Sequence, residues 1–144
     1  MLSKTWGDDV DKNGIMLEET MVAALETVDG LSDRVCPVVD IKKSTGPLVV
    51  YDQKIETEEE QLYGDSGLLT AVFQIHVLHN TYTRMRHLSE RVKATLKAMK
   101  ECSQGQLHVE GVTVELATPD LLETKVQLFR RTYNVTFLYQ IKED

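Results

Sequence analysis

The segment from Leu68 to Leu78 constrains the fold most, because its apolar residues alternate with less apolar ones and a helical pattern follows at once. A period of two predicts a strand with one buried face, and a period of 3.6 predicts an amphipathic helix with one buried stripe. The apolar positions are Ala71, Phe73, Ile75 and Val77 in the strand, and Met85, Leu88, Val92, Leu96 and Met99 in the helix. The sequence therefore predicts a half-buried strand that feeds an amphipathic helix.

Two helices and five strands are expected along the chain. The helices are predicted over residues 15–29 and 82–101, and Gly30 and Gly105 follow their ends. The strands are predicted over residues 34–38, 48–55, 68–78, 109–116 and 133–141. The stretch between the second and third strands, residues 56–67, is too acidic to be buried and is expected to be a polar connection.

Two irregularities are expected within these strands. Gly111 interrupts the alternation of the fourth strand. Val126 and Leu128 have the opposite parity to the alternating residues of the last strand, which predicts a bulge or break near Arg130 and Arg131.

The order of elements, α-β-β-β-α-β-β, defines the expected fold. Short links suit antiparallel pairing, whereas the helical link from the third to the fourth strand is long enough for a crossover. We expect an α+β fold: one mostly antiparallel sheet of about five strands with two helices packed on one face. Residues 1–14 are polar and are expected to form a flexible N-terminal arm, and residues 15–144 a single α+β domain.

Composition limits the function classes. The chain has 144 residues, a formal net charge of -7 and 42% hydrophobic residues, enough for one sizeable core. Residues 1–66 carry 15 acidic and 6 basic side chains, and residues 67–144 carry 8 and 10, so self-association through opposite patches is open. An acidic chain repels the phosphate backbone, which argues against sequence-independent nucleic-acid binding.

No membrane segment or signal peptide is expected, which predicts a cytoplasmic protein. Cys36 and Cys102 are expected to be reduced thiols.

The motifs that suggest metal binding or catalysis each lack a required part. Residues 9–14 match the opening of a calcium-binding loop, but Thr20 stands where a bidentate Glu is needed. Residues 64–67 match a serine-protease segment, but every histidine lies downstream, in the wrong order. His76 and His79 are three residues apart in a strand and are expected on opposite faces. We expect no catalytic residues, no metal, no cofactor and no enzymatic activity.

Several segments resemble the tail-completion proteins of long-tailed bacteriophages and prophages. They are Arg34-Val35-Cys36-Pro37, Pro47-Leu48-Val49-Val50-Tyr51, Val72-Phe73-Gln74-Ile75-His76-Val77 with Thr81-Tyr82-Thr83, and Tyr133-Asn134-Val135-Thr136-Phe137. The resemblance spans roughly residues 15 to 141. It implies a non-enzymatic structural protein that forms a ring, a hexamer by analogy, at the head-proximal end of the tail tube and takes part in tail completion and head-tail joining.

The resemblance also implies partners and a location. The partners would be other copies of the chain, the tail-tube protein and the head-connector or stopper proteins, while DNA passes through without specific binding. The protein would reside in the host bacterial cytoplasm during assembly and then in the virion tail. The alternative is a small cytoplasmic ligand-binding or regulatory α+β module, with a metabolite in a cleft beside the sheet.

Two charged segments are the candidate subunit-interface or lumen residues. We hypothesise that the acidic segment 56–65 faces the lumen or a neighbouring subunit's basic helix; a solvated loop and a solvated helix face are the plainer interpretations. The residues are Glu56, Glu58, Glu59, Glu60 and Asp65 in the acidic segment, and Arg84, Arg86, Arg91, Lys93 and Lys97 in the helix.

Overall fold

The computed structural model describes residues 8–37, 45–58, 68–124 and 126–141, with the backbone alone over 8–15 and 55–58. The helices are α1 (Asp8–Glu26) and α3 (Tyr82–Lys97). The strands are β1 (Val35–Pro37), β2 (Leu48–Glu58), β3 (Leu69–His79), β4 (Ser103–Gln104), β5 (Leu107–Leu116), β6 (Leu121–Glu123) and β7 (Leu128–Ile141). The fold is α+β, as expected from the sequence.

The described strands form one sheet in the order β1-β2-β3-β7-β5-β4, and β6 pairs with β7 beyond the end of β5. The prediction of about five strands was too low, because β4 and β6 are segments of two and three residues that carry no alternation of their own. All pairs are antiparallel except β1 with β2. The last strand of the chain therefore lies in the middle of the sheet.

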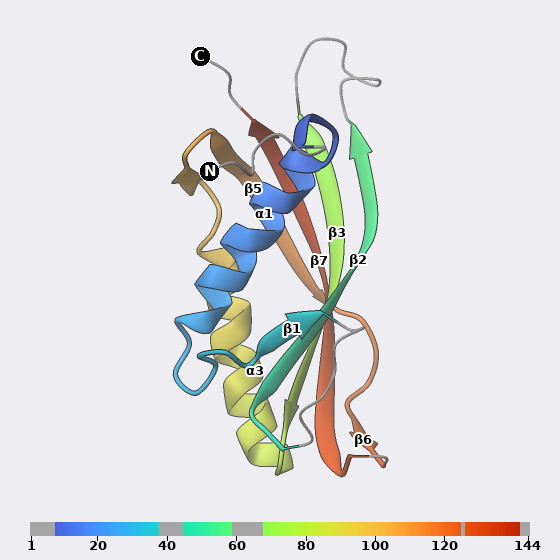
Figure 1. Ribbon diagram of the computed structural model, residues 1–144. Coiled ribbons are helices and arrows are strands. Elements are labelled where there is room, and N and C mark those ends of the chain that lie inside the picture. The colour runs from blue at the N-terminus through green and yellow to red at the C-terminus, as the bar shows by residue number, and fades with distance from the viewer. Residues whose placement is uncertain (1–7, 38–44, 59–67, 125, 142–144) are drawn as a thin grey trace.

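The link from β3 through α3 to β5 is a crossover, as the sequence indicated. Both β3 and β5 run antiparallel to β7, which separates them, so β3 and β5 are parallel to each other. Figure 1 shows α1 and α3 on the same side of the twisted sheet. Thr81 caps α3, because its hydroxyl accepts a hydrogen bond from the backbone N–H of Arg84 at 3.2 Å.

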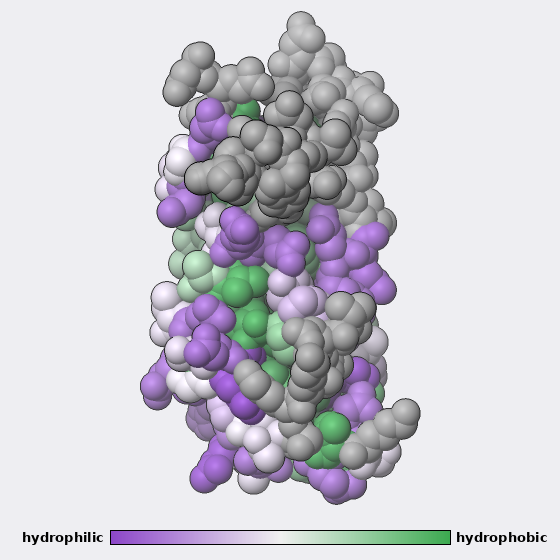
Figure 2. Space-filling view, in the orientation of Figure 1, coloured by the Kyte–Doolittle hydropathy of each residue, from purple (hydrophilic) through white to green (hydrophobic). Residues whose placement is uncertain are grey.

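The core lies between the helices and the sheet. The alternating side chains of β3, from Leu69 to Val77, pack there together with those of β7 and the apolar stripes of both helices. Phe73 is at its centre, with its ring centroid 6.2 Å from that of Tyr51 and 5.8 Å from that of Phe137, the latter edge-on. Figure 2 shows that the surface on the α1 side is mostly hydrophilic, with a small hydrophobic area near the middle of the view.

The first helix begins earlier than expected. It runs from Asp8 to Glu26 rather than over residues 15–29, so residues 8–14 of the expected flexible arm are helical, and residues 1–7 lie outside the described part. The polar sequence before Ile15 carries no apolar stripe, which is why periodicity did not mark the helix start there.

The bulge predicted near Arg130 and Arg131 was wrong. The pairing of β3 with β7 keeps one register from Leu69 with Tyr139 to His79 with Phe129. Leu128 has the opposite parity because it faces the other side of the sheet, where it packs in a second small cluster. That cluster consists of Leu48, Val50, Leu78 and Leu128, with Cys36 and Val126 beside it. The irregularity predicted at Gly111 is confirmed, and a second one lies between Gln53 and Ile55.

Candidate functional site

The acidic candidates lie at one end of the sheet. Glu56 and Glu58 belong to the backbone of β2, which extends three residues past the expected end, and pair with Ala71 and Leu69. The predicted polar connection therefore starts later than expected. Glu59, Glu60 and Asp65 lie outside the described residues.

The basic candidates lie on the outer side of α3. Arg84, Arg86, Arg91 and Lys97 are exposed, and Lys93 is half-buried. The helix starts just after His79, at the other end of β3 from Leu69, so its first turn is roughly 30 Å from the described glutamates of β2 at ~3.3 Å per residue of strand. The structure does not bring Glu56 and Glu58 to the start of α3 within one chain.

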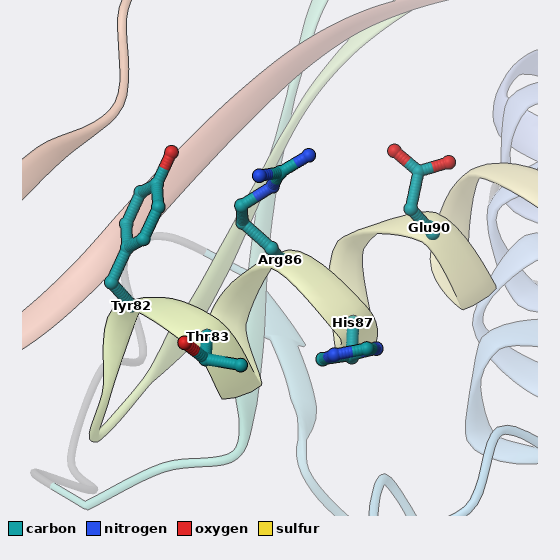
Figure 3. Close-up of a pocket in the computed structure, with 5 residues that line it drawn as sticks. All are labelled: Tyr82, Thr83, Arg86, His87 and Glu90. Carbon is teal, nitrogen blue, oxygen red and sulfur yellow. The ribbon is translucent and has the colours of Figure 1, made fainter.

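A shallow hollow of about 300 Å³ lies along the first turns of α3. Tyr82, Thr83, Arg86, His87 and Glu90 line it (Figure 3). Tyr82, Arg86 and Glu90 are four residues apart and project from the same side of the helix, as Figure 3 shows. The hollow thus combines an aromatic ring with a cation and an anion on one helix face.

Two residues that line this hollow, Tyr82 and Glu90, belong to a polar network at the turn between β5 and β6. Asp120 accepts hydrogen bonds from Arg131 Nε at 2.9 Å and Nη2 at 2.8 Å, and from the Tyr82 hydroxyl at 3.1 Å. The hydrogen bonds from Arg131 hold the pKa of Asp120 below its usual value. Glu90 lies 3.6 Å from Arg131 and extends this ion pair. These contacts hold the β5–β6 turn against α3.

The sheet face away from the helices carries a second polar group of residues. His76 Nδ1 is 2.9 Å from the hydroxyl of Thr132, and burial, with Arg130 next in importance, lowers the pKa of His76. Arg130 pairs with Glu123 at 3.0 Å. His79 is at the end of β3, where its ring accepts a hydrogen bond from the backbone of Asn80. Within the described ranges, no group of three or more His, Cys, Asp or Glu side chains could hold a metal ion.

The sequence did not indicate the exposed apolar side chains at one edge of the sheet. The large hydrophobic residues exposed in the described part are Leu116 at 57%, Tyr82 at 43%, Leu122 at 41% and Leu121 at 38%. Leu116 ends β5, Leu121 and Leu122 form most of β6, and Tyr82 contacts the turn between them. We call these four residues the β5–β6 flank. The Leu121-Leu122 pair just after the turn at Thr118-Pro119-Asp120 is the sequence feature that marks it.

Comparison with known proteins gives a fold relationship. No family model and no curated protein matches the chain. Among solved structures, a chain from "Virion of native gene transfer agent (GTA) particle" is similar, with a TM-score of 0.55 and 14% sequence identity over 82% of this chain and 83% of that one. Because the identity is low, this similarity shows a shared fold. In the described part of the chain, no helix is both long and apolar enough to span a membrane.

Proposed function

We propose that this protein is a structural component of a phage-like virion, which assembles as a ring at the head-proximal end of a tail and joins tail to head without catalysis. The observation that carries the proposal is the match in fold, over most of both chains, to a chain of a gene transfer agent virion. The sequence resemblance to tail-completion proteins supports the same assignment.

The surface of the chain supports association with other proteins. The β5–β6 flank concentrates exposed leucines at a sheet edge, and such apolar surface favours protein contacts. The net charge of -7 supports a ring through which DNA passes without being held, because negative charge repels the phosphate backbone. The proposed partners are further copies of the chain, the tail-tube protein and the head-connector proteins.

The test is the absolute mass in solution, measured by light scattering after size exclusion over a range of protein and salt concentrations. The expected result is a closed oligomer, a hexamer by the resemblance, formed either alone or on addition of tail-tube protein. A monomer or dimer that ignores tail-tube and connector proteins would contradict the proposal. That result would favour the ligand-binding alternative, for which the hollow along α3 is the first place to look.

The acidic segment has a role within the same proposal. We place Glu56, Glu58, Glu59, Glu60 and Asp65 at the lumen or against a neighbour's α3, because that helix exposes Arg84, Arg86, Arg91 and Lys97 beside the half-buried Lys93. Charge reversal at Glu58, Glu59 and Glu60 is expected to impair ring assembly or DNA passage, while Glu19→Lys on the exposed side of α1 serves as the control. Unchanged assembly and DNA passage in the triple variant would exclude this role.

A further inference from the structure

We infer that the β5–β6 flank of one copy binds Leu62 and Tyr63 of the next copy, while the glutamates that precede this pair lie against the basic side of α3. The inference rests on the proposed ring, and it assigns the acidic segment to a neighbouring copy rather than to the lumen. It starts from the four exposed hydrophobic side chains of the flank, which one copy leaves in contact with water.

Three side chains of the flank lie on the same side of the sheet as α3. Leu116 pairs with Tyr133, whose ring belongs to the core under the helices. Leu122 pairs with Phe129, whose ring centroid is 6.1 Å from that of Tyr82 in α3. Because residues directly opposite each other in an antiparallel pair share a face, Leu116 and Leu122 both point to the helix side, where Tyr82 lies.

A polar network holds this surface in place. Arg131 lies between the two rows of β7 that pair with these leucines, and its bonds to Asp120 fix the turn between β5 and β6. The hydroxyl of Tyr82 bonds to the same carboxylate at 3.1 Å, and the N–H of Ala117 donates to the carbonyl of Thr132 at 2.8 Å. A surface that is ordered before binding loses little conformational entropy when a partner arrives.

The helix layer ends before β5 does. The side chains of β5 that face the helices become more exposed along the strand, since Val109 is buried, Val114 is half-buried and Leu116 is 57% exposed. The described helices therefore leave the last residue of β5 uncovered, and an apolar side chain from another copy can bury Leu116 there.

The side of α3 next to the flank is basic. Tyr82 is followed by Arg86, Glu90, Lys93 and Lys97 at spacings of four, four, three and four residues, which places them along one side of the helix. Glu90 is already in an ion pair with β7, whereas Arg86, Lys93 and Lys97 form no ion pair in the described ranges. Three positive charges beside the flank are thus available to carboxylates of another copy.

The acidic segment carries complementary groups in a matching order. Four glutamates come first and an apolar pair follows: Glu56, Glu58, Glu59 and Glu60, then Leu62 and Tyr63. The carboxylates suit the basic side of α3, and the two large side chains suit the flank. The same complementarity holds for the whole chain, because residues 1–66 have a net charge of -9 (15 acidic, 6 basic) and residues 67–144 one of +2 (8 acidic, 10 basic).

The length of the segment excludes this surface of the same copy. Glu58 pairs with Leu69, so residues 59–68 begin and end at the same end of the sheet. A loop of these ten residues with adjacent ends extends at most ~19 Å from them, at ~3.3–3.6 Å per residue. Tyr82 opens α3 at the other end of β3, roughly 30 Å away at ~3.3 Å per residue of strand. The segment can therefore reach Tyr82 only in another copy.

The contact also fits a ring. Each copy uses two different surfaces, the segment after β2 and the flank with α3. Repetition of such a head-to-tail contact engages both surfaces of every copy once the series closes on itself, and the closed product is a ring.

The test is photo-cross-linking in the full-length chain with p-benzoylphenylalanine in place of Tyr63, which keeps an aromatic side chain at that position. Unlabelled and isotope-labelled copies are mixed, assembled with and without tail-tube protein, irradiated and digested for mass spectrometry. The expected result is cross-links between labelled and unlabelled peptides that end at residues 82–86 or 116–122. The matched control carries the photoreactive residue in place of Glu19, on the exposed side of α1, and should give none there.

Two outcomes separate this inference from the proposed function. Rings of wild-type mass in which position 63 gives no cross-link between copies at the flank or α3 would overturn the inference and leave the ring standing. If the wild type forms no oligomer even with tail-tube protein, the proposed function fails and this inference fails with it.

A double-mutant comparison tests the same contact without the photoreactive residue. Tyr63→Ser and Leu122→Ala are each expected to weaken association about tenfold, as the loss of an interface anchor does. The double variant should be no weaker than the weaker single variant, because both changes remove one contact. Light scattering over a range of protein concentrations measures the association, and circular dichroism checks the fold. Effects that multiply in the double variant would show two independent surfaces and overturn the inference.

Discussion

The hydroxyl of Tyr51 donates a hydrogen bond of 2.6 Å to Glu18 Oε2 and so connects the middle of β2 to α1, 33 positions earlier in the chain. Burial, and next this bond to Glu18, raise the pKa of Tyr51 above its ordinary value. The phenol is therefore kept in its neutral, donating form.

Tyr51→Phe is expected to lower the free energy of unfolding by about 1 kcal/mol at neutral pH, because the bond is lost and the Glu18 carboxylate keeps only solvent. Since the folded pKa lies above the unfolded value of about 10, this contribution is complete below pH ~10 and declines as pH rises through the folded pKa. Urea unfolding at pH 7 and at pH 10 to 11 measures both effects. A variant as stable as the wild type at pH 7 would show that the bond contributes nothing.

The bidentate pair of Asp120 with Arg131 gives a prediction for acidic pH. Asp120→Asn is expected to destabilise the fold by about 1 kcal/mol at pH 7, because two charge-assisted hydrogen bonds are weakened. The folded pKa of Asp120 lies below the unfolded value, so its contribution is complete above pH ~4 and is lost as pH falls through the folded pKa. The difference between variant and wild type should therefore shrink toward pH 2.

Thermal unfolding monitored by circular dichroism at several pH values tests this prediction. Glu115→Gln removes an exposed carboxylate from the neighbouring β5 and should leave the stability unchanged. Equal effects of the two substitutions would mean that general charge, rather than the pair with Arg131, determines the stability.

Gly46 makes a close approach that no other residue fits. A Cβ atom at this position would lie 2.6 Å from His79 Cα and 3.1 Å from the backbone nitrogen of Asn80. Gly46→Ala is expected to cost about 1–3 kcal/mol of stability, as other overpacked substitutions do. Gly111→Ala is the control, because its Cβ would meet nothing nearer than 3.9 Å. Comparable stabilities of the two variants by urea unfolding would contradict the steric argument.

The exposed leucines should affect association and not folding. Leu116→Glu and Leu122→Glu each replace an exposed side chain, so the free energy of unfolding should change by less than about 0.5 kcal/mol. The oligomer detected by light scattering should be lost in both. Full assembly of both variants would show that the β5–β6 flank lies outside the interface.

The sequence identified the elements whose apolar residues have a single period. The alternation from Leu69 to Val77 and the stripe from Met85 to Leu96 both fill the core as expected. It did not identify the backbone of β4 and β6, because segments of two or three residues have no period. The opposite parity of Leu128 was wrongly interpreted as a bulge. A period of two shows which residues share a face, but it does not show that apolar side chains cover both faces at one end of the sheet.

For the candidate site, sequence could group charges by segment but not in space. It placed the basic residues on α3, but Glu56 and Glu58 belong to β2 rather than to the polar connection, and Glu59, Glu60 and Asp65 lie outside the described residues. Which residues of β3 and β5 share a row of the sheet depends on β7, which follows both strands in the chain. No local pattern contains that information.

The central position of β7 has a consequence for synthesis in the cell. In the sheet β7 lies between β3 and β5, so a nascent chain that has emerged only as far as Leu116 lacks the strand that pairs with both of them. The sheet can close only after the residues up to about Ile141 have left the ribosome, so its completion comes late in the synthesis of the described residues. Until then the exposed strands are substrates for chaperones, and a premature stop in β7 yields a product that quality control removes.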